Sequence, residues 1–150
     1  HMLLGVEGNG WAQVIGELAY ERSGPERILS TYPLLAALVD AVGPDPSAEA
    51  AAELGTLVAR MSALRRLSIS VAMSLDAGRS PVTEAALVKD LGTQLEGEIP
   101  EVARKLVPPG RNETFDALVA ESVLSAPGFT LRGGTNEILR GIVARELGVR

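Results

Sequence analysis

The chain has 150 residues, of which 46% are hydrophobic and only 3% are aromatic, and its formal net charge is −5. A core with so few aromatic side chains must be built from Leu, Val, Ile, Ala and Met, which favours packed helices in one all-α domain over a β-sandwich or barrel. The acidic balance argues against a nucleic-acid partner or an anionic membrane surface, and the absence of cysteine excludes disulfides, thiol nucleophiles and Cys-ligated zinc.

The first ten residues differ in character from the rest. His1 and Met2 look like a cloning remnant, so the only histidine is not counted as a ligand, and we predict no metal site. Gly5, Gly8 and Gly10 superficially suggest a dinucleotide-binding GxGxxG motif, but no strand precedes them and the third spacing is wrong. We therefore interpret residues 1–10 as a tag remnant and linker, and residues 11–150 as a single helical-bundle domain.

From residue 11 onward, apolar residues recur at helical spacing and predict one face of a helix. The face consists of Trp11, Val14, Ile15, Leu18 and Ala19. The helical pattern continues through residues 20–43, where Pro25 and Pro33 should break or kink it.

A long helix is predicted next, between two boundary signals. Asp45 followed by Pro46 is typical of an N-cap and first helical position, and Gly78 is a stop signal. Between them, apolar spacings of three and four predict the heptad seam of a left-handed helical bundle. The seam consists of Leu54, Leu57, Met61, Leu64, Ser68, Val71 and Leu75.

Two shorter patterns follow. Ser80 and Pro81 predict the start of a helix with Leu87, Leu91, Leu95 and Ile99 on one side. Pro100 should kink or end this helix. Asn112 can cap a further helix that carries Phe115, Leu118, Val119 and Val123, and we expect Pro127 and Gly128 to end it.

The last segment is a glycine turn before an amphipathic helix. Gly133 and Gly134 precede Thr135, a predicted N-cap, and Gly148 ends the pattern. Outward backbone N–H donors and two residues without Cβ would let a polar or anionic ligand approach this turn. The alternative is that Gly-Gly-Thr only reverses the chain, because a glycine-rich turn is a weak motif.

Two segments of the sequence resemble one known family. Residues 132–148, RGGTNEILRGIVARELG, resemble the C-terminal signature of the acyl-CoA dehydrogenases, and residues 17–24, ELAYERSG, resemble the first long helix of that family's C-terminal domain. The family's members are flavoproteins that oxidise an acyl-CoA thioester to its 2,3-enoyl form. The resemblance implies a four-helix bundle of the acyl-CoA dehydrogenase C-terminal type, an acyl-CoA substrate and FAD as cofactor, with a role in lipid metabolism.

The resemblance also implies where the catalytic base lies. In many members a glutamate directly before Gly-Thr removes the α-proton of the substrate, and this chain has Gly133 there. A subset of the family instead carries this glutamate immediately before an arginine in the first long helix, as Glu21 precedes Arg22. Glu21 is therefore the implied base. The alternative is an exposed carboxylate beside Arg22 and Arg27.

The remaining site residues are carried over position by position. Arg22 and Gly134 would contact the substrate, and Thr135 and Glu137 would lie near the flavin. Glu137 is the competing carboxylate, but the helix dipole would keep it ionised and a weaker base.

Other positions depart from the family pattern. Residues 43–55 lack the arginine and Phe-Gly pair that hold the flavin diphosphate and adenine in many members, and residues 105–114, KLVPPGRNET, replace a glycine-rich segment. We therefore expect FAD only in an intact protein or complex, and the isolated domain to be inactive. The alternative function is a non-catalytic helical scaffold or interaction subunit derived from the family.

The sequence also carries expectations about partners and cellular location. The resemblance implies a homo-oligomer, either a dimer or a tetramer, or a heteromeric partner from the same family. No apolar run approaches the roughly 20 residues that span a bilayer, and no signal-peptide pattern is present, so we expect a cytoplasmic protein without a membrane partner.

Overall fold

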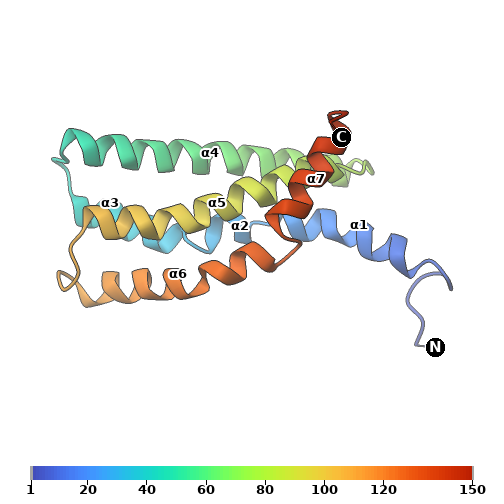
Figure 1. Ribbon diagram of the computed structural model, residues 1–150, viewed down its shortest axis with the longest axis horizontal. Coiled ribbons are helices and arrows are strands. Elements are labelled where there is room, and N and C mark those ends of the chain that lie inside the picture. The colour runs from blue at the N-terminus through green and yellow to red at the C-terminus, as the bar shows by residue number, and fades with distance from the viewer. Residues whose placement is uncertain (1, 150) are drawn as a thin grey trace.

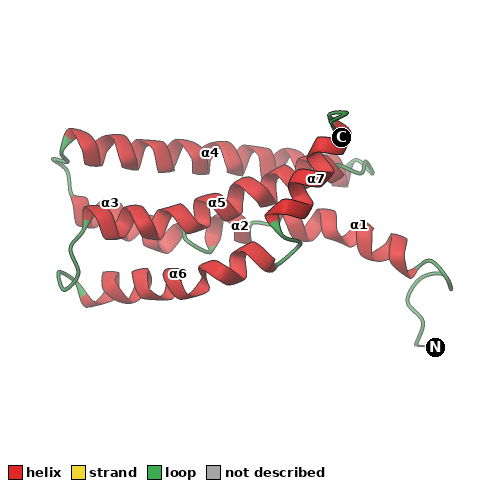
Figure 2. Cartoon of the chain, viewed as in Figure 1, coloured by secondary structure: helices red, strands yellow, loops and turns green. Residues whose placement is uncertain are grey.

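The structure, a computed structural model, describes residues 2–149, which fold into seven helices without a strand (Figure 2). The predicted all-α class is confirmed. The helices are α1 (Gly10–Ser23), α2 (Glu26–Leu29), α3 (Tyr32–Val42), α4 (Ala48–Asp76), α5 (Val82–Leu106), α6 (Glu113–Leu131) and α7 (Asn136–Glu146).

A four-helix bundle forms the body of the molecule. Figure 1 shows α3, α4, α5 and α6 running alongside one another, with α7 crossing the bundle near one end and α1 extending beyond it. Helix α5 contacts each of the other six helices. Because it is covered on most sides, α5 is the helix around which the core is organised.

The seam predicted for α4 is confirmed. Leu57, Met61, Leu64 and Val71 are buried, and the other seam positions are half-buried. The predicted start was wrong by two residues, since Ser47 is the N-cap and its hydroxyl accepts a hydrogen bond from the Ala50 N–H at 3.2 Å. Asp45 and Pro46 thus belong to the loop that leads into the cap.

The four prolines that were predicted to break, kink or end a helix behave in two ways. Pro25 and Pro33 break the first helical segment as predicted, since α1 ends at Ser23, α2 follows Pro25, and Pro33 lies in the first turn of α3. Pro100 does not end α5, and the prediction that Pro127 and Gly128 end α6 was wrong because α6 continues to Leu131. Packing along both helices sustains them, although each proline removes one backbone hydrogen bond.

The apolar face predicted for α1 is only partly used. Trp11 is 78% exposed, and Val14 and Ile15 are also exposed, whereas Ala19 is buried. The first turns of α1 lie beyond the bundle, so no helix of residues 2–149 covers them (Figure 1). Only the C-terminal half of α1 packs on α4 and α5, and this places Glu21 and Arg22 where α1 meets the bundle.

The face predicted for α5 needs a similar correction. Leu95 and Ile99 are buried, but Leu91 is 43% exposed. Polar side chains take buried positions on the same helix, among them Lys89 and Glu96.

Residues 2–149 contain no helix whose length and apolarity would allow it to traverse a lipid bilayer.

Candidate functional site

The last turn of α1 meets the turn between α6 and α7. Arg22, which is 6% exposed, donates a hydrogen bond from Nε to the carbonyl oxygen of Gly133 at 2.8 Å. Burial lowers the pKa of the Arg22 guanidinium, and the charge of Glu21 opposes that shift. The structure therefore brings together two predicted segments that are 111 residues apart.

Glu21 lies beside the space that a side chain at position 133 would occupy. A Cβ placed on Gly133 would be 3.4 Å from Glu21 Oε1 and 3.4 Å from Arg27 Nη2. Arg27 of α2 also fixes the end of α1, because its Nη2 donates a hydrogen bond to the Glu21 carbonyl oxygen at 3.3 Å. The Glu21 side chain itself is exposed and Leu18 is only half-buried, so residues 2–149 form no apolar wall around this carboxylate.

Both glycines of the turn adopt backbone conformations that disfavour other residues. Gly133 has φ +70° and Gly134 has φ +105°. A Cβ on Gly134 would lie 3.7 Å from Arg22 Nη2, so the Arg22 guanidinium borders the turn on this side. The turn thus has an open backbone with a buried cation against it.

Thr135 and Glu137 lie at the start of α7, as predicted. Thr135 is the N-cap residue, but its side chain makes no capping hydrogen bond to the helix. Glu137 is exposed, and hydrogen bonds from its own backbone N–H and from the Thr135 side chain lower the pKa of its carboxyl. The Asn136 Oδ1 atom next to them is buried without a hydrogen-bond partner.

Three charged residues that were not among the predicted site residues lie beneath the turn. Arg27, Lys89 and Glu96 are each at most 1% exposed. Lys89, Thr93 and Glu96 are four and three residues apart, which puts them on one side of α5. That polar stripe at helical spacing is the sequence signal that could have identified Lys89 and Glu96.

Lys89 ties the end of α6 to α5. Its Nζ donates to the carbonyl oxygens of Phe129 at 3.0 Å and Thr130 at 3.3 Å. Thr93 donates to the Lys89 carbonyl oxygen at 2.8 Å. Burial first, and then the charge of Arg27, lower the pKa of the Lys89 ammonium. These contacts fix the last turn of α6, directly before the glycine turn.

Glu96 pairs with the residue that precedes the two glycines. Its Oε1 accepts from Arg132 Nη2, whereas its Oε2 is buried without a hydrogen-bond partner. Burial raises the pKa of the Glu96 carboxyl to about 7, although Arg132 and Arg27 act in the opposite direction. Arg132 also donates to Ser30 Oγ at 3.3 Å, and its guanidinium lies 4.8 Å from the centre of the Phe129 ring.

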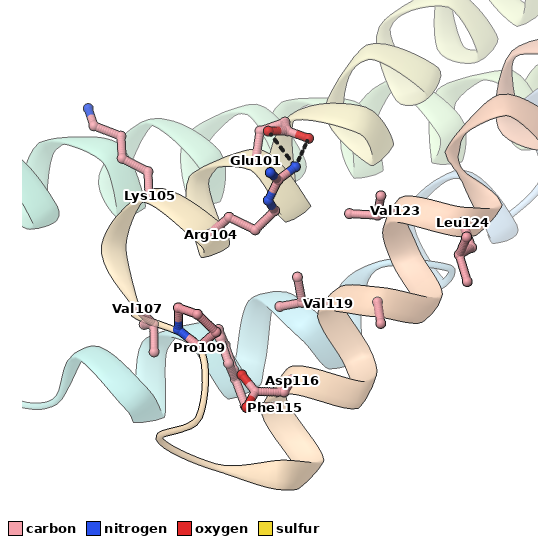
Figure 3. A pocket seen from close by; sticks show the side chains of 11 residues that line it. Glu101, Arg104, Lys105, Val107, Pro109, Phe115, Asp116, Val119, Val123 and Leu124 are labelled. Carbon is pink, nitrogen blue, oxygen red and sulfur yellow. Dashed lines mark hydrogen bonds and ion pairs between the residues drawn. The ribbon is translucent and has the colours of Figure 1, made fainter.

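A separate groove of about 1000 Å³ opens between the C-terminal end of α5 and the N-terminal half of α6 (Figure 3). Apolar side chains form its floor, including Val107, Phe115 and Val119, and the ion pair between Glu101 and Arg104 lies at its edge. None of the predicted site residues lines it. We therefore place the candidate site at the glycine turn, where the buried cations and Glu21 converge.

The described part of the chain offers no obvious metal centre. Residues 2–149 contain no group of three or more His, Cys, Asp or Glu side chains that could hold a metal ion.

Comparison with known proteins adds one family and a shared fold. The family model described as "Acyl-CoA dehydrogenase, C-terminal domain" matches residues 48–148. Three solved structures have the same fold: a glutaryl-coenzyme A dehydrogenase in complex with glutaryl-CoA (19% identity, TM-score 0.81), the prolyl acyl carrier protein oxidase AnaB (18%, 0.79) and an electron transferring flavoprotein of Acidaminococcus fermentans (22%, 0.84).

These matches cover almost all of this chain but a minority of the others. The three alignments include 97–98% of the present chain and 40–41% of each solved chain. At these identities the structures establish the fold alone. No curated protein matches the sequence.

Proposed function

Since the chain belongs to the acyl-CoA dehydrogenase family, whose C-terminal domain its residues 48–148 match, we propose that it supplies the helical part and the catalytic base of a flavin-dependent acyl-CoA dehydrogenase. The reaction would remove two hydrogens from adjacent carbons of an acyl thioester, one as a proton and one as a hydride. Because the chain spans about two fifths of the solved chains that it resembles, we assign this activity to an intact protein or complex that contains it.

Glu21 is the proposed base, and one observation carries the assignment. The Glu21 carboxylate lies 3.4 Å from the point at which a Cβ on Gly133 would stand. Position 133 matches the place where many family members have their glutamate, so a carboxylate on either position would reach the same region. As a general base, Glu21 would take the α-proton of the thioester once the bound acyl chain shields it from water.

Two neighbours would hold the base and admit the substrate. Arg22 fixes the Gly133 carbonyl and thereby keeps the end of α1 against the turn. Gly134 has no Cβ, which leaves space for a thioester beside the turn. The buried Arg22 guanidinium borders that space, so it would favour a substrate oxygen there.

The start of α7 is where the chain would contact FAD. The first backbone N–H groups of a helix lack intrahelical acceptors, and the buried Asn136 Oδ1 has no hydrogen-bond partner. The start of α7 therefore has donors and an acceptor that a ligand could use. These features fit one edge of a flavin site, with Thr135 and Glu137 as the residues nearest to it. When bound, FAD would supply the hydride acceptor.

The proposal is tested by replacing Glu21 in the intact flavoprotein or complex. We expect Glu21→Gln to lower turnover by at least about a hundredfold, the scale of lost general-base catalysis, with the flavin content unchanged. Glu17→Gln is the matched control, because Glu17 is exposed one turn earlier on the same helix. That variant should keep normal turnover.

Moving the carboxylate gives a sharper test. Combining Glu21→Gly with Gly133→Glu should restore part of the lost activity, because the Cβ of the new glutamate would lie 3.4 Å from the position that Glu21 Oε1 occupies in the unmodified chain. Recovery would be incomplete, since φ +70° at position 133 strains any residue other than glycine. No recovery in a folded double variant would contradict the shared position of the two carboxylates.

Two observations favour the alternative of a non-catalytic scaffold subunit. The Glu21 side chain is exposed, and no glutamate stands at position 133. Near-normal turnover of the Glu21→Gln variant would favour this alternative, or a base donated by a partner chain.

A further inference from the structure

We propose that Glu96 positions the Gly133–Gly134 turn against Glu21 through its ion pair with Arg132, and that this hold weakens when Glu96 binds a proton. The functional meaning of this inference rests on the proposed role of Glu21. The inference itself concerns only the contacts of the turn. Glu96 would act through Arg132 and touch no reacting atom, so it is a positioning residue.

The geometry links Glu96 to the turn through a short covalent path. Arg132 directly precedes Gly133, and its Nη2 pairs with Oε1 of the fully buried Glu96. The other face of the turn is held by Arg22, whose Nε donates to the Gly133 carbonyl oxygen at 2.8 Å. The turn is therefore attached to α5 through Glu96 and to α1 through Arg22, and within it the Gly134 N–H donates to the Leu131 carbonyl oxygen at 3.3 Å.

The glycines give this attachment its importance. With φ +70° and +105°, Gly133 and Gly134 lie in a region that only glycine enters easily, and glycine can also leave it easily. Their conformation must be maintained by flanking contacts, because their own backbone preference is weak. On the N-terminal side of the two glycines, the nearest residue in the sequence with such a side-chain contact is Arg132, which pairs with Glu96.

The surroundings of Glu96 make its charge state responsive. The groups that face it are Arg132 from the turn, Arg27 and Ser30 from α2 and its C-cap, and Lys89 from α5. Its second oxygen, Oε2, has no hydrogen-bond partner although the side chain is fully buried. The ion pair favours the charged form, and the missing partner and burial favour the neutral form.

Burial is the larger effect and raises the pKa of Glu96 to about 7. Near neutral pH the carboxyl would thus exist in both forms. In the ionised form it attracts Arg132 strongly, and in the neutral form it keeps at most an ordinary hydrogen bond. The position of Gly133 and Gly134 should accordingly follow the protonation of a residue that lies on another helix.

The test follows the amide resonances of Gly133 and Gly134 by NMR in the isotope-labelled chain, across roughly two pH units on either side of neutrality. We expect both resonances to shift with a midpoint near the Glu96 pKa of about 7. In Glu96→Gln this titration should be absent. Absence of any such titration in the unmodified chain would overturn the proposal, whatever the variants do.

Three variants identify the responsible group. Glu101→Gln, an exposed carboxylate on the same helix, should keep the titration, and so should Glu21→Gln. Arg132→Gln should uncouple the two glycines while Glu96, followed by its own side-chain carboxyl resonance, still titrates. A titration that persists in Glu96→Gln, or disappears in Glu21→Gln, would overturn the proposal.

The measurement uses neither flavin nor substrate. A Glu21→Gln variant with normal turnover would therefore refute the proposed function and leave this inference standing. Conversely, glycine resonances that ignore Glu96 would refute this inference and leave the assignment of Glu21 open to its own test.

Discussion

At the scale of single residues, the buried charges set this chain apart from an ordinary helical bundle. Arg27 and Lys89 are almost fully buried beside Glu96, and Arg132 reaches the same carboxylate from the turn. Surface pairs such as Lys105 with Glu49 are exposed and contribute little to stability. The buried group is different, because removing one partner leaves the others without a counter-charge.

Glu96 should make stability depend on pH in a defined direction. Its pKa is about 7 in the folded chain against an ordinary value of 4.5, so between these values the folded state binds more protons than the unfolded state. The contribution of Glu96 to the free energy of unfolding is therefore present at acid pH and falls as pH rises through this window, by on the order of 3 kcal/mol.

Urea denaturation at the two ends of the window tests this prediction. The difference in stability between the chain and Glu96→Gln should move in favour of the variant as pH rises, because the variant cannot acquire the buried negative charge. Other titrating groups cancel in this comparison. An identical pH dependence of the two proteins would contradict it.

At the scale of elements, close contact between α2 and α5 places Arg27 beneath the turn. Arg27 crosses α5 at Gly92, where an added Cβ would lie 3.0 Å from Arg27 Cβ and 3.4 Å from Leu64 Cδ2. Gly92 is buried, and no other residue type would leave this space. A helix-weakening glycine thus stands where Arg27 of α2 and Leu64 of α4 pack closely against the backbone of α5.

Alanine substitutions at two glycines of α5 should therefore have opposite effects. A Cβ on Gly97 would meet no atom within 4 Å, so Gly97→Ala should stabilise the chain by about 0.5–1 kcal/mol. Gly92→Ala gains the same helix propensity but overpacks a tight contact, which costs about 1–3 kcal/mol. Urea denaturation should rank Gly92→Ala below Gly97→Ala. Equal stability of the two variants would show that α2 can move away freely.

At the scale of the whole molecule, large apolar side chains remain exposed on several helices, including α1 and α6. Trp11, Val14 and Ile15 are exposed on α1, and Leu124 and Leu131 are 82% and 67% exposed on α6. Helix α6 also packs apolar residues inward, so it is apolar on both sides. Such helices are normally covered by another surface.

We therefore expect the chain to self-associate at concentrations on the order of tens of micromolar. Leu124→Glu should weaken this association without lowering the stability of the fold, because the side chain is 82% exposed. Sedimentation analysis of both proteins provides the measurement. A monomeric unmodified chain at this concentration would contradict the prediction.

Flavin binding belongs to the same scale. Thr135 and Glu137 would provide only one edge of the proposed flavin site, and the chain spans about two fifths of the solved chains that share its fold. Purified alone, it should be colourless. A stoichiometric flavin absorbance spectrum after mixing with FAD and dialysis would refute this expectation.

The sequence by itself determined the helices and the family. Apolar spacing, Asn112 as an N-cap and the breaks at Pro25 and Pro33 act locally, and they predicted the all-α class and most helices correctly. The same local information was wrong about Pro127 and left open whether Pro100 kinks or ends α5, because tertiary packing can sustain a helix that loses one hydrogen bond.

Only the tertiary structure decided which side chains are covered and which meet. Periodicity placed Trp11 on the apolar face of a helix and did not select Glu96. In the structure Trp11 is exposed because α1 extends past the bundle, and Glu96 is buried because α5 contacts all other helices. Likewise, no spacing rule brings Glu21 to within 3.4 Å of the side-chain space at Gly133. Burial and contacts between distant segments depend on how helices are arranged, and a pattern that repeats every few residues carries no information about that arrangement.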